Sequence, residues 1–303
     1  MPMNKQIKAD LMLLGITIIW GASYMLTKMG LEGLEPLNLT ALRFIIGFLV
    51  SAAIFHKKIL NTGLKTVKLA FFLGILLFGM FILMAFGLGY TTASNAGFLI
   101  SLSVILIPII SFFFLKQKIE RRVIIGVILA FIGIALLSLD AEFKMNFGDL
   151  LCILCALLCS IHVIVIEIFT RQVEPIALGV LQLGFAGLFS LISSLALENF
   201  GLPSTGLSWI SVLLLSIFCT AIGYVVQTIA QQHTTATHTG LILSLEPVFS
   251  AIFAFIFLQE ILPPKGYVGA AILLAGVLIA EIDIKVLKQK NRINIDSSDK
   301  IKG

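Results

Sequence analysis

Charged residues are scarce in this sequence. Lysine, arginine, aspartate and glutamate make up 12% of the 303 residues, whereas 59% are hydrophobic, and the mean hydropathy is +1.08. A soluble chain carries about twice that share of charged side chains. The composition therefore excludes a soluble globular protein and indicates a membrane protein, and it gives no reason to expect a nucleic-acid partner.

Cysteine is rare as well. Only four cysteines are present, and Cys152, Cys155 and Cys159 fall on one face of a single predicted helix. This spacing does not suit a disulfide framework, so we expect reduced packing residues, with a metal site as the alternative. The sequence also lacks a Walker-type phosphate loop and a channel-filter motif. We expect no cofactor and no enzymatic activity, and any transport must draw its energy from a gradient.

Long apolar runs are abundant. Ten runs of membrane-spanning length recur between Leu11 and Asp283, and each could cross roughly 30 Å of hydrocarbon as a helix. We expect an all-α membrane protein with ten transmembrane helices joined by short connections. The expected spans are 11–28, 37–55, 68–90, 94–115, 123–139, 149–169, 176–197, 208–231, 238–258 and 266–283.

Basic residues gather between alternate spans. With the N-terminus inside, most of them face the cytoplasm, as the positive-inside rule requires. We therefore expect both termini in the cytoplasm, with a disordered tail over 286–303. The basic residues of this side, before the tail, are Lys5, Lys8, Lys57, Lys58, Lys65, Lys68, Lys116, Lys118, Arg121, Arg122 and Arg171.

One stretch of the chain occurs twice with a few substitutions. Residues 91–102 read TTASNAGFLISL and residues 234–245 read TTATHTGLILSL, and the same shift of 143 positions aligns 91–140 with 234–283. We divide the chain into a first repeat over 1–144, with helices 1 to 5, and a second over 145–285, with helices 6 to 10. Five crossings are an odd number, so the repeats must be inverted relative to each other. Inverted repeats are typical of secondary transporters, although duplication without transport is an alternative.

Short motifs along the chain point to a family. They are WGASY at 20–24, ALRF at 41–44, TTASNAG at 91–97, LEPVFSA at 245–251 and LQE at 258–260, with glycines seven apart in helices 5 and 10. Together they resemble the EamA family of the drug/metabolite transporter superfamily, over about 10–283. The resemblance implies a ten-helix carrier, generally an exporter in the bacterial inner membrane. It also implies a central cavity lined mainly by helices 1, 3, 4, 6, 8 and 9, with helices 5 and 10 peripheral and often at a dimer contact.

Helix 1 carries a polar and aromatic face. Its members recur at i, i+3, i+4 and i+7, and they are Trp20, Ser23, Tyr24 and Thr27. Residues with this spacing share one side of a helix. We interpret the face as a wall of the substrate cavity, with interhelical hydrogen bonding as the alternative.

Helices 3 and 8 form two unlike walls. Tyr224 and Gln227 give helix 8 a polar face, whereas the equivalent face of helix 3 includes Phe81 and Met84. If both faces line the cavity, the ligand is amphiphilic, with a hydrogen-bonding end and an apolar or aromatic body.

Small polar and aromatic residues in helices 4 and 9 suit the same cavity. Asn95, Phe98 and Ser244 mark faces that would reach it, and Asn95 aligns with His238. We interpret them as substrate-binding or gate positions, and tight helix packing is the alternative.

Two ionisable residues lie deep in predicted spans, His162 in helix 6 and Glu246 in helix 9. Such residues cost a few kcal/mol in a membrane and are functional by default. We take both as candidates for proton coupling, and His162 also as a substrate-binding residue. The alternative is that both are neutral and hydrogen-bond their neighbours. Pro108 and Pro247 each remove a backbone donor, so they are predicted hinges.

Arg43 is the remaining charge within a span. We expect it to snorkel or to bind carbonyl ends, with anion recognition as the alternative. The glycines of helices 5 and 10 are Gly126, Gly133, Gly269 and Gly276. They indicate close helix packing, either within one protomer or between two.

These patterns favour a secondary active transporter. We expect it to export amino acids or related small amphiphilic metabolites or drugs across the bacterial inner membrane by alternating access, with proton coupling left open. The alternatives are an intramembrane enzyme, a lipid scramblase, or a facilitator without ion coupling. The expected partners are a small-molecule substrate and the lipid bilayer, and a homodimer is left open.

Overall fold

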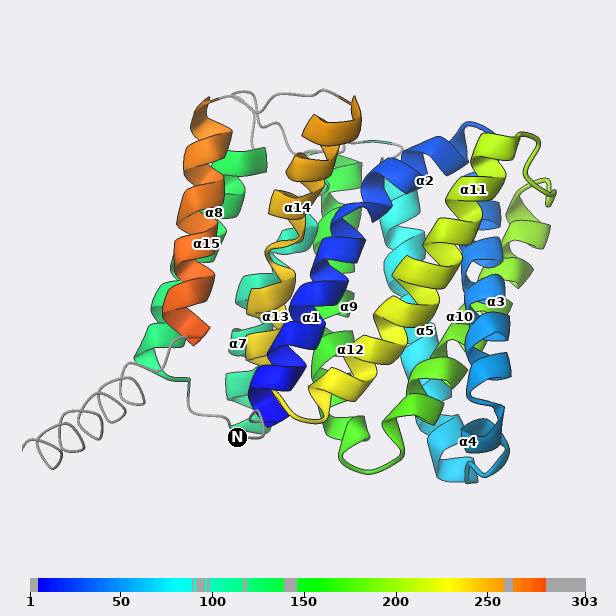
Figure 1. The fold of residues 1–303 in the computed structure, drawn as a ribbon, viewed down its shortest axis with the longest axis horizontal. Helices are drawn as coiled ribbons and strands as arrows, with labels where there is room; N and C mark the ends of the chain where they lie inside the picture. The colour runs from blue at the N-terminus through cyan, green and yellow to red at the C-terminus, as the bar shows by residue number, and fades with distance from the viewer. Residues whose placement is uncertain are drawn as a thin grey trace, which may run out of the picture.

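The structure is a computed structural model that describes residues 5–88, 90, 96, 99–116, 119–138, 146–258 and 264–281. Helices account for nearly all of these residues (Figure 1). Seven helices are long and apolar enough to cross a membrane, over Lys5–Leu31, Pro36–Ile54, Leu64–Gly87, Phe147–Thr170, Pro175–Leu197, Gly206–Gln231 and Ala236–Phe257. The chain is therefore a multi-pass membrane protein. The other three predicted spans contain α7, α8 and α15, and the count of ten crossings stays a prediction.

Two similar series of helices follow one another. The first is α1 (Lys5–Gly21), α2 (Ser23–Leu31), α3 (Pro36–Ile54), α4 (His56–Leu60), α5 (Leu64–Leu88), α7 (Ser103–Leu115) and α8 (Arg121–Ser138). The second is α9 (Phe147–Thr170), α10 (Pro175–Leu197), α11 (Gly206–Leu214), the π-helical segment η1 (Leu215–Ile222), α12 (Gly223–Gln231), α13 (Ala236–Leu243), α14 (Glu246–Phe253), the π-helical segment η2 (Ala254–Leu258) and α15 (Pro264–Glu281).

Local sequence signals set several helix starts. Pro36 and Pro175 occupy the first turns of α3 and α10, where a missing backbone N–H costs nothing. Asn146 and Asp149 form a capping box at the start of α9. Each device satisfies or removes a backbone donor that the helix itself leaves without a partner.

The corresponding helices α3 and α10 run antiparallel. At one end of the pair, the Glu198 carboxylate accepts from the backbone N–H groups of Leu37 at 2.9 Å and Asn38 at 2.8 Å. At the other end, Lys58 Nζ lies 2.6 Å from Glu174 Oε1. We call the end with Glu198 the upper end of the bundle and the end with Lys58 the lower end, as drawn in Figure 1. These two corresponding helices are thus upside down relative to each other.

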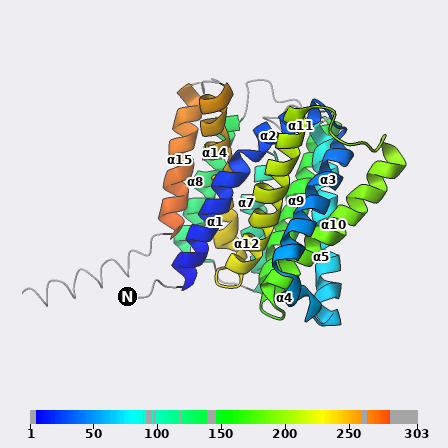
Figure 2. The same ribbon diagram turned by 45° about the vertical axis from the view of Figure 1, so that its right-hand side comes forward.

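Helices α8 and α15 pack together at one side of the bundle, as Figures 1 and 2 show. A Cβ on Gly126 would lie 2.6 Å from the carbonyl oxygen of Gly276, and one on Gly133 would lie 2.7 Å from that of Gly269. This register is again antiparallel. The four predicted glycines therefore bring two helices of one chain into backbone contact, and this packing needs no second protomer.

The outer faces of the helices are apolar. Large exposed side chains include Phe71, Phe114, Leu195 and Ile256. A soluble protein rarely exposes so much contiguous apolar surface, whereas a bilayer covers it without cost.

Three of the predicted spans are interrupted. The first breaks at Ala22, between α1 and α2. The fourth and ninth break at Leu102 and Leu245, which are equivalent positions in the two repeats, and each donates its backbone N–H three residues back, to Leu99 and Ile242. The same turn is therefore built twice.

The interruptions differ from the predicted hinges. Pro108 lies inside α7, which continues through it. Pro247 follows the break at Leu245 and occupies the first turn of α14, where proline is tolerated. The hinge role of both prolines stays a prediction.

Candidate substrate-binding site

Aromatic rings from both repeats meet at the centre of the bundle. Tyr224 of α12 lies 5.1 Å from Trp20 of α1 and 6.2 Å from Phe44 of α3, measured between ring centroids. The rings of Phe44 and Phe81 meet edge to face at 4.9 Å, and His162 of α9 lies 6.2 Å from Tyr224. Four of the predicted site residues, Trp20, Phe81, His162 and Tyr224, therefore belong to one cluster.

The π-helical segment η1 supplies polar partners to this cluster. The carbonyl oxygen of Cys219 accepts from Trp20 Nε1 at 2.7 Å, and the hydroxyl of Thr220 accepts from Arg43 Nε at 2.6 Å. Short π-helical stretches often lie at functional sites, because their wider turn changes which groups a helix presents. Here the two groups belong to successive residues and serve two different helices of the first repeat.

A cavity of about 220 Å³ lies between α2, α3, α5 and η1, near the upper end. Its lining is mostly apolar, with Arg43 as its charged member. The lining residues are Thr27, Leu31, Pro36, Leu39, Thr40, Arg43, Phe81, Met84, Ala85 and Leu215. Three predicted site residues, Thr27, Phe81 and Met84, thus surround one space.

Arg43 is almost completely enclosed, with 6% of its surface exposed. Its guanidinium carbon lies 5.0 Å from the centroid of the Phe81 ring, a cation–π contact. The expectation that Arg43 snorkels or binds carbonyl ends is wrong, because Nε donates to the Thr220 hydroxyl deep in the bundle. The alternative, anion recognition, is taken up below.

His162 is held by a chain of side chains on the second repeat. Its Nε2 lies 3.0 Å from Gln182 Oε1, Gln182 Nε2 donates to the Thr228 hydroxyl at 3.2 Å, and that hydroxyl donates to the Tyr224 carbonyl at 2.7 Å. Only 1% of His162 is exposed. The chain fixes the imidazole with a neutral amide, which is the arrangement of a satisfied buried histidine.

Glu246 begins α14, directly after the interruption at Leu245, and is half-buried. The hydroxyl of Ser244 donates to the carbonyl oxygen of Leu241 at 2.6 Å, so it is engaged within its own turn. The break in this span therefore places a half-buried carboxylate in the first turn of α14.

The lower end is closed by contacts between α9, α1 and the loop before α13. The buried Glu167 carboxylate lies 2.6 Å from Arg171 Nη2 and accepts from the backbone N–H of Ala236 at 2.7 Å. The Thr234 hydroxyl donates to Asp10 Oδ1 at 3.2 Å. The start of α13 is thus tied to both neighbouring helices.

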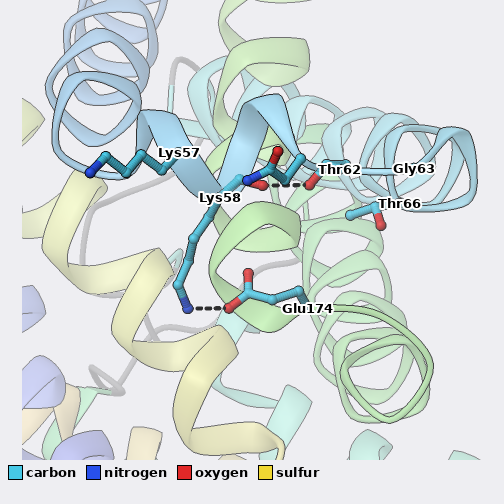
Figure 3. A pocket seen from close by; sticks show the side chains of 7 residues that line it. Lys57, Lys58, Thr62, Gly63, Thr66 and Glu174 are labelled. Atoms are coloured by element: carbon cyan, nitrogen blue, oxygen red, sulfur yellow. Dashed lines mark hydrogen bonds and ion pairs between the residues drawn. The ribbon is translucent and has the colours of Figure 1, made fainter.

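A larger cavity of about 320 Å³ lies on the surface of the lower end (Figure 3). It sits between α4 and the start of α10, with the Lys58–Glu174 ion pair across it. It involves none of the central rings. We therefore do not assign it to the substrate pathway.

Several predicted positions lie apart from the cavity or beyond the description. Ser23 begins α2 next to the break, and Gln227 lies in α12 with 1% of its surface exposed. Asn95, Phe98 and the side chain of Tyr24 lie outside the described residues. The break at Ala22 also means that Trp20 and Thr27 do not share one continuous helix face.

The site also contains residues that the sequence patterns did not single out. Gln182 and Glu167 are polar residues within otherwise apolar spans. An isolated polar residue in such a span is the sequence signal that could have identified them. Thr220, in contrast, belongs to the polar face of helix 8, because it recurs with Tyr224 and Gln227 at i, i+4 and i+7. Among the described residues, no group of three His, Cys, Asp or Glu side chains is placed to hold a metal ion.

Substituting Gly223 tests the packing of Trp20. A Cβ at this position would lie 2.5 Å from Trp20 Nε1, so Gly223→Ala must displace the indole from the Cys219 carbonyl. We expect the free energy of unfolding to fall by about 1–1.5 kcal/mol, the contribution of one lost hydrogen bond. In a Trp209→Phe background, the emission of Trp20 should change. Gly206→Ala, where a Cβ meets nothing within 4 Å, is the matched control.

Comparison with known proteins identifies the family. Residues 7–139 and 146–281 each match the EamA-like transporter family. The chain belongs to this family. The resemblance that the sequence motifs indicated is confirmed, with one EamA match in each half of the chain.

Relatives of this EamA-like transporter cover it almost completely. An uncharacterized transporter of Archaeoglobus fulgidus is 33% identical over 283 residues, which span 92% of this chain and 88% of the relative. The uncharacterized transporter YetK of Bacillus subtilis is 26% identical over 93% of this chain and 89% of its own. A crystal structure with 19% identity has a TM-score of 0.79 and covers 90% of this chain and 96% of that one, which supports the fold.

Proposed function

We propose that this EamA-like transporter is a secondary transporter that exports a small amphiphilic metabolite by alternating access. One observation carries the proposal. The space beside Arg43 and Phe81 lies near the upper end, between helices of two inverted repeats, while Glu167 and Asp10 tie the lower end closed. A carrier whose central space lies toward one side of the membrane while the other side is closed is in one of the two main states of an alternating-access cycle.

The charge distribution supports an orientation. The basic residues of the lower end include Lys5, Lys58, Arg121 and Arg171, at helix ends that Figure 1 places together. By the positive-inside rule we assign the lower end to the cytoplasm, with ten crossings and both termini inside. The upper end then faces outward from the bacterial inner membrane, and the cavity is outward-facing.

The interruptions offer a route to the opposite state. The break at Ala22 lies against α14, because a Cβ on Gly21 would come 2.5 Å from the Cβ of Phe249. Irregular backbone at membrane depth is tolerated where it is enclosed by protein or lines a cavity. We infer that α2 and α14 tilt about these breaks, opening the lower end as the upper end closes.

Of the two predicted coupling residues, Glu246 is better placed than His162. A coupling group must exchange protons with water during the cycle. Glu246 is half-buried at a helix break, whereas His162 is enclosed and bonded to the amide of Gln182. We therefore propose that any proton coupling runs through Glu246.

A proteoliposome experiment tests the transport function and its coupling. We expect counterflow of a small amphiphilic solute with the unsubstituted protein, and accumulation when a proton gradient is added. Glu246→Gln should keep counterflow and lose accumulation, because an amide cannot carry the proton. Glu120→Gln, the same change at a side chain that is 65% exposed, should keep both, so it is the matched control. Absence of counterflow for every metabolite class would refute the transporter, and unchanged accumulation in Glu246→Gln would refute the coupling role.

A further inference from the structure

Arg43 has hydrogen-bond donors that the described residues leave unpaired. It is also buried, and an unpaired charge is costly in a buried position. Arginine stays charged in proteins and carries donors on Nε and on both terminal nitrogens. Among the described residues, one hydrogen bond engages it, from Nε to Thr220, and the Phe81 ring adds a cation–π contact. Among the described residues no acidic side chain forms an ion pair with it.

A buried charge normally has a partner. Removing a guanidinium from water without an anion leaves a desolvation penalty that one hydroxyl and one ring do not offset. Thr40 also lines the cavity, but the hydrogen bond of its hydroxyl runs to the carbonyl oxygen of Pro36 at 2.8 Å. Arg43 lines the 220 Å³ cavity, and among the described residues its terminal nitrogens have no hydrogen-bond partner, which indicates that the missing anion is a ligand.

The other lining residues of the cavity indicate the size and polarity of that ligand. Phe81, Met84 and Leu39 form apolar walls around the guanidinium, and Thr27 adds a hydroxyl. Cavities for drug-sized ligands measure about 300–1,000 Å³, so this one suits a smaller molecule. Guanidinium binds planar carboxylates through paired hydrogen bonds.

We propose that Arg43 is the anion-binding subsite of the carrier and that the transported metabolite is a small monocarboxylate with an apolar or aromatic body. The proposal rests on the proposed function and names its substrate class. The carboxylate pairs with the terminal nitrogens of Arg43 while its body lies against Phe81 and Met84. The bound carboxylate then forms a direct ion pair with Arg43.

Binding to the purified full-length protein tests this directly. The probes are 3-phenylpropanoate and 4-methylpentanoate, each compared with its neutral amide by equilibrium dialysis. We expect each carboxylate to bind at least about tenfold more tightly than its amide, since charge-assisted hydrogen bonds are roughly twice as strong as neutral ones. Equal binding of acid and amide would overturn the proposal without using any variant.

Variants locate the site. Arg43→Gln should remove the preference for the carboxylate, and Arg43→Lys should keep part of it, because the charge remains while the planar fork is lost. Lys58→Gln removes one exposed positive charge at the lower end and should change nothing. A carboxylate preference that survives in folded Arg43→Gln would overturn the assignment. The assignment would also be overturned if the protein bound phosphatidylglycerol vesicles and neither of the two acids.

The two hypotheses fail differently. Arg43-dependent carboxylate binding without counterflow in proteoliposomes would reject transport and leave the anion subsite standing. Counterflow of neutral solutes, with no preference between acid and amide, would reject the subsite and leave transport standing.

Discussion

Replacing Gly133 with leucine is expected to eliminate folded protein from the membrane. A Cβ at this position would lie 2.6 Å from the amide nitrogen of Leu273 and 2.7 Å from the carbonyl oxygen of Gly269, both backbone atoms that no rotamer change can move. Overpacking a core with movable side chains already costs about 1–3 kcal/mol. Here α8 and α15 must separate along their shared face, so the cost is larger.

The measurement is the yield and thermal stability of monodisperse protein in detergent. Gly15→Leu is the matched control, because a Cβ on Gly15 of α1 meets nothing within 4 Å. Gly133→Ala should fall between the two. Normal yield and stability of Gly133→Leu would show that α8 and α15 are not in backbone contact in the folded protein.

The family and the duplication could be predicted from the sequence because short motifs and a repeated segment indicate them directly. The shift that aligns 91–102 with 234–245 places Leu102 on Leu245, and both residues form the same interrupting turn. The glycine spacing in helices 5 and 10 predicted close packing. The sequence could not say which helix each glycine meets, because the contact partner depends on the tertiary fold.

The positions of the helix interruptions could not be predicted from proline, the usual helix-breaking residue. Proline marks a lost donor, and α7 nevertheless continues through Pro108. Ala22 and Leu102 are good helix formers, although Ala22 follows Gly21, which is a poor one. At Ala22 the tertiary fold overrides propensity, because Gly21 lies against α14.

The site was predicted in part. Helical spacing within a polar face selected Trp20 and Tyr224, and the equivalence of helices 3 and 8 selected Phe81. Their rings belong to one cluster in the structure. Arg43 was assigned to a structural role because depth in a span says nothing of the neighbouring helix. Its contact with Thr220 joins residues 177 positions apart, and that pairing is a property of the fold.

Replacing Glu167 with alanine is expected to open the lower end. Its carboxylate accepts from the backbone N–H of Ala236 at the start of α13 and pairs with Arg171, and only 1% of the residue is exposed. A carboxylate at a helix N-terminus is favoured by the helix dipole as well as by the hydrogen bond. Alanine removes both contacts, so the closed lower end loses stability relative to the open one.

A cysteine at Thr237, in the first turn of α13, measures this opening. Thr237 is 7% exposed, so Thr237→Cys should react slowly with a membrane-impermeant maleimide in the otherwise unsubstituted protein, against the background of the four native cysteines. Adding Glu167→Ala should raise the labelling rate by about tenfold or more, because a shift of about 1.4 kcal/mol changes the open population tenfold. Net export should fall, since a carrier held open on one side cannot complete its cycle.

Lys58→Gln is the control at the same end of the bundle. It breaks an ion pair whose two side chains are 46% and 40% exposed, and exposed pairs contribute about 0–1 kcal/mol. We expect its labelling rate to match that of the parent. If Glu167→Ala also labels at the parent rate, the contact between α9 and α13 does not hold the lower end closed, and the closure must come from the Thr234–Asp10 hydrogen bond and the packing of α1 against α13.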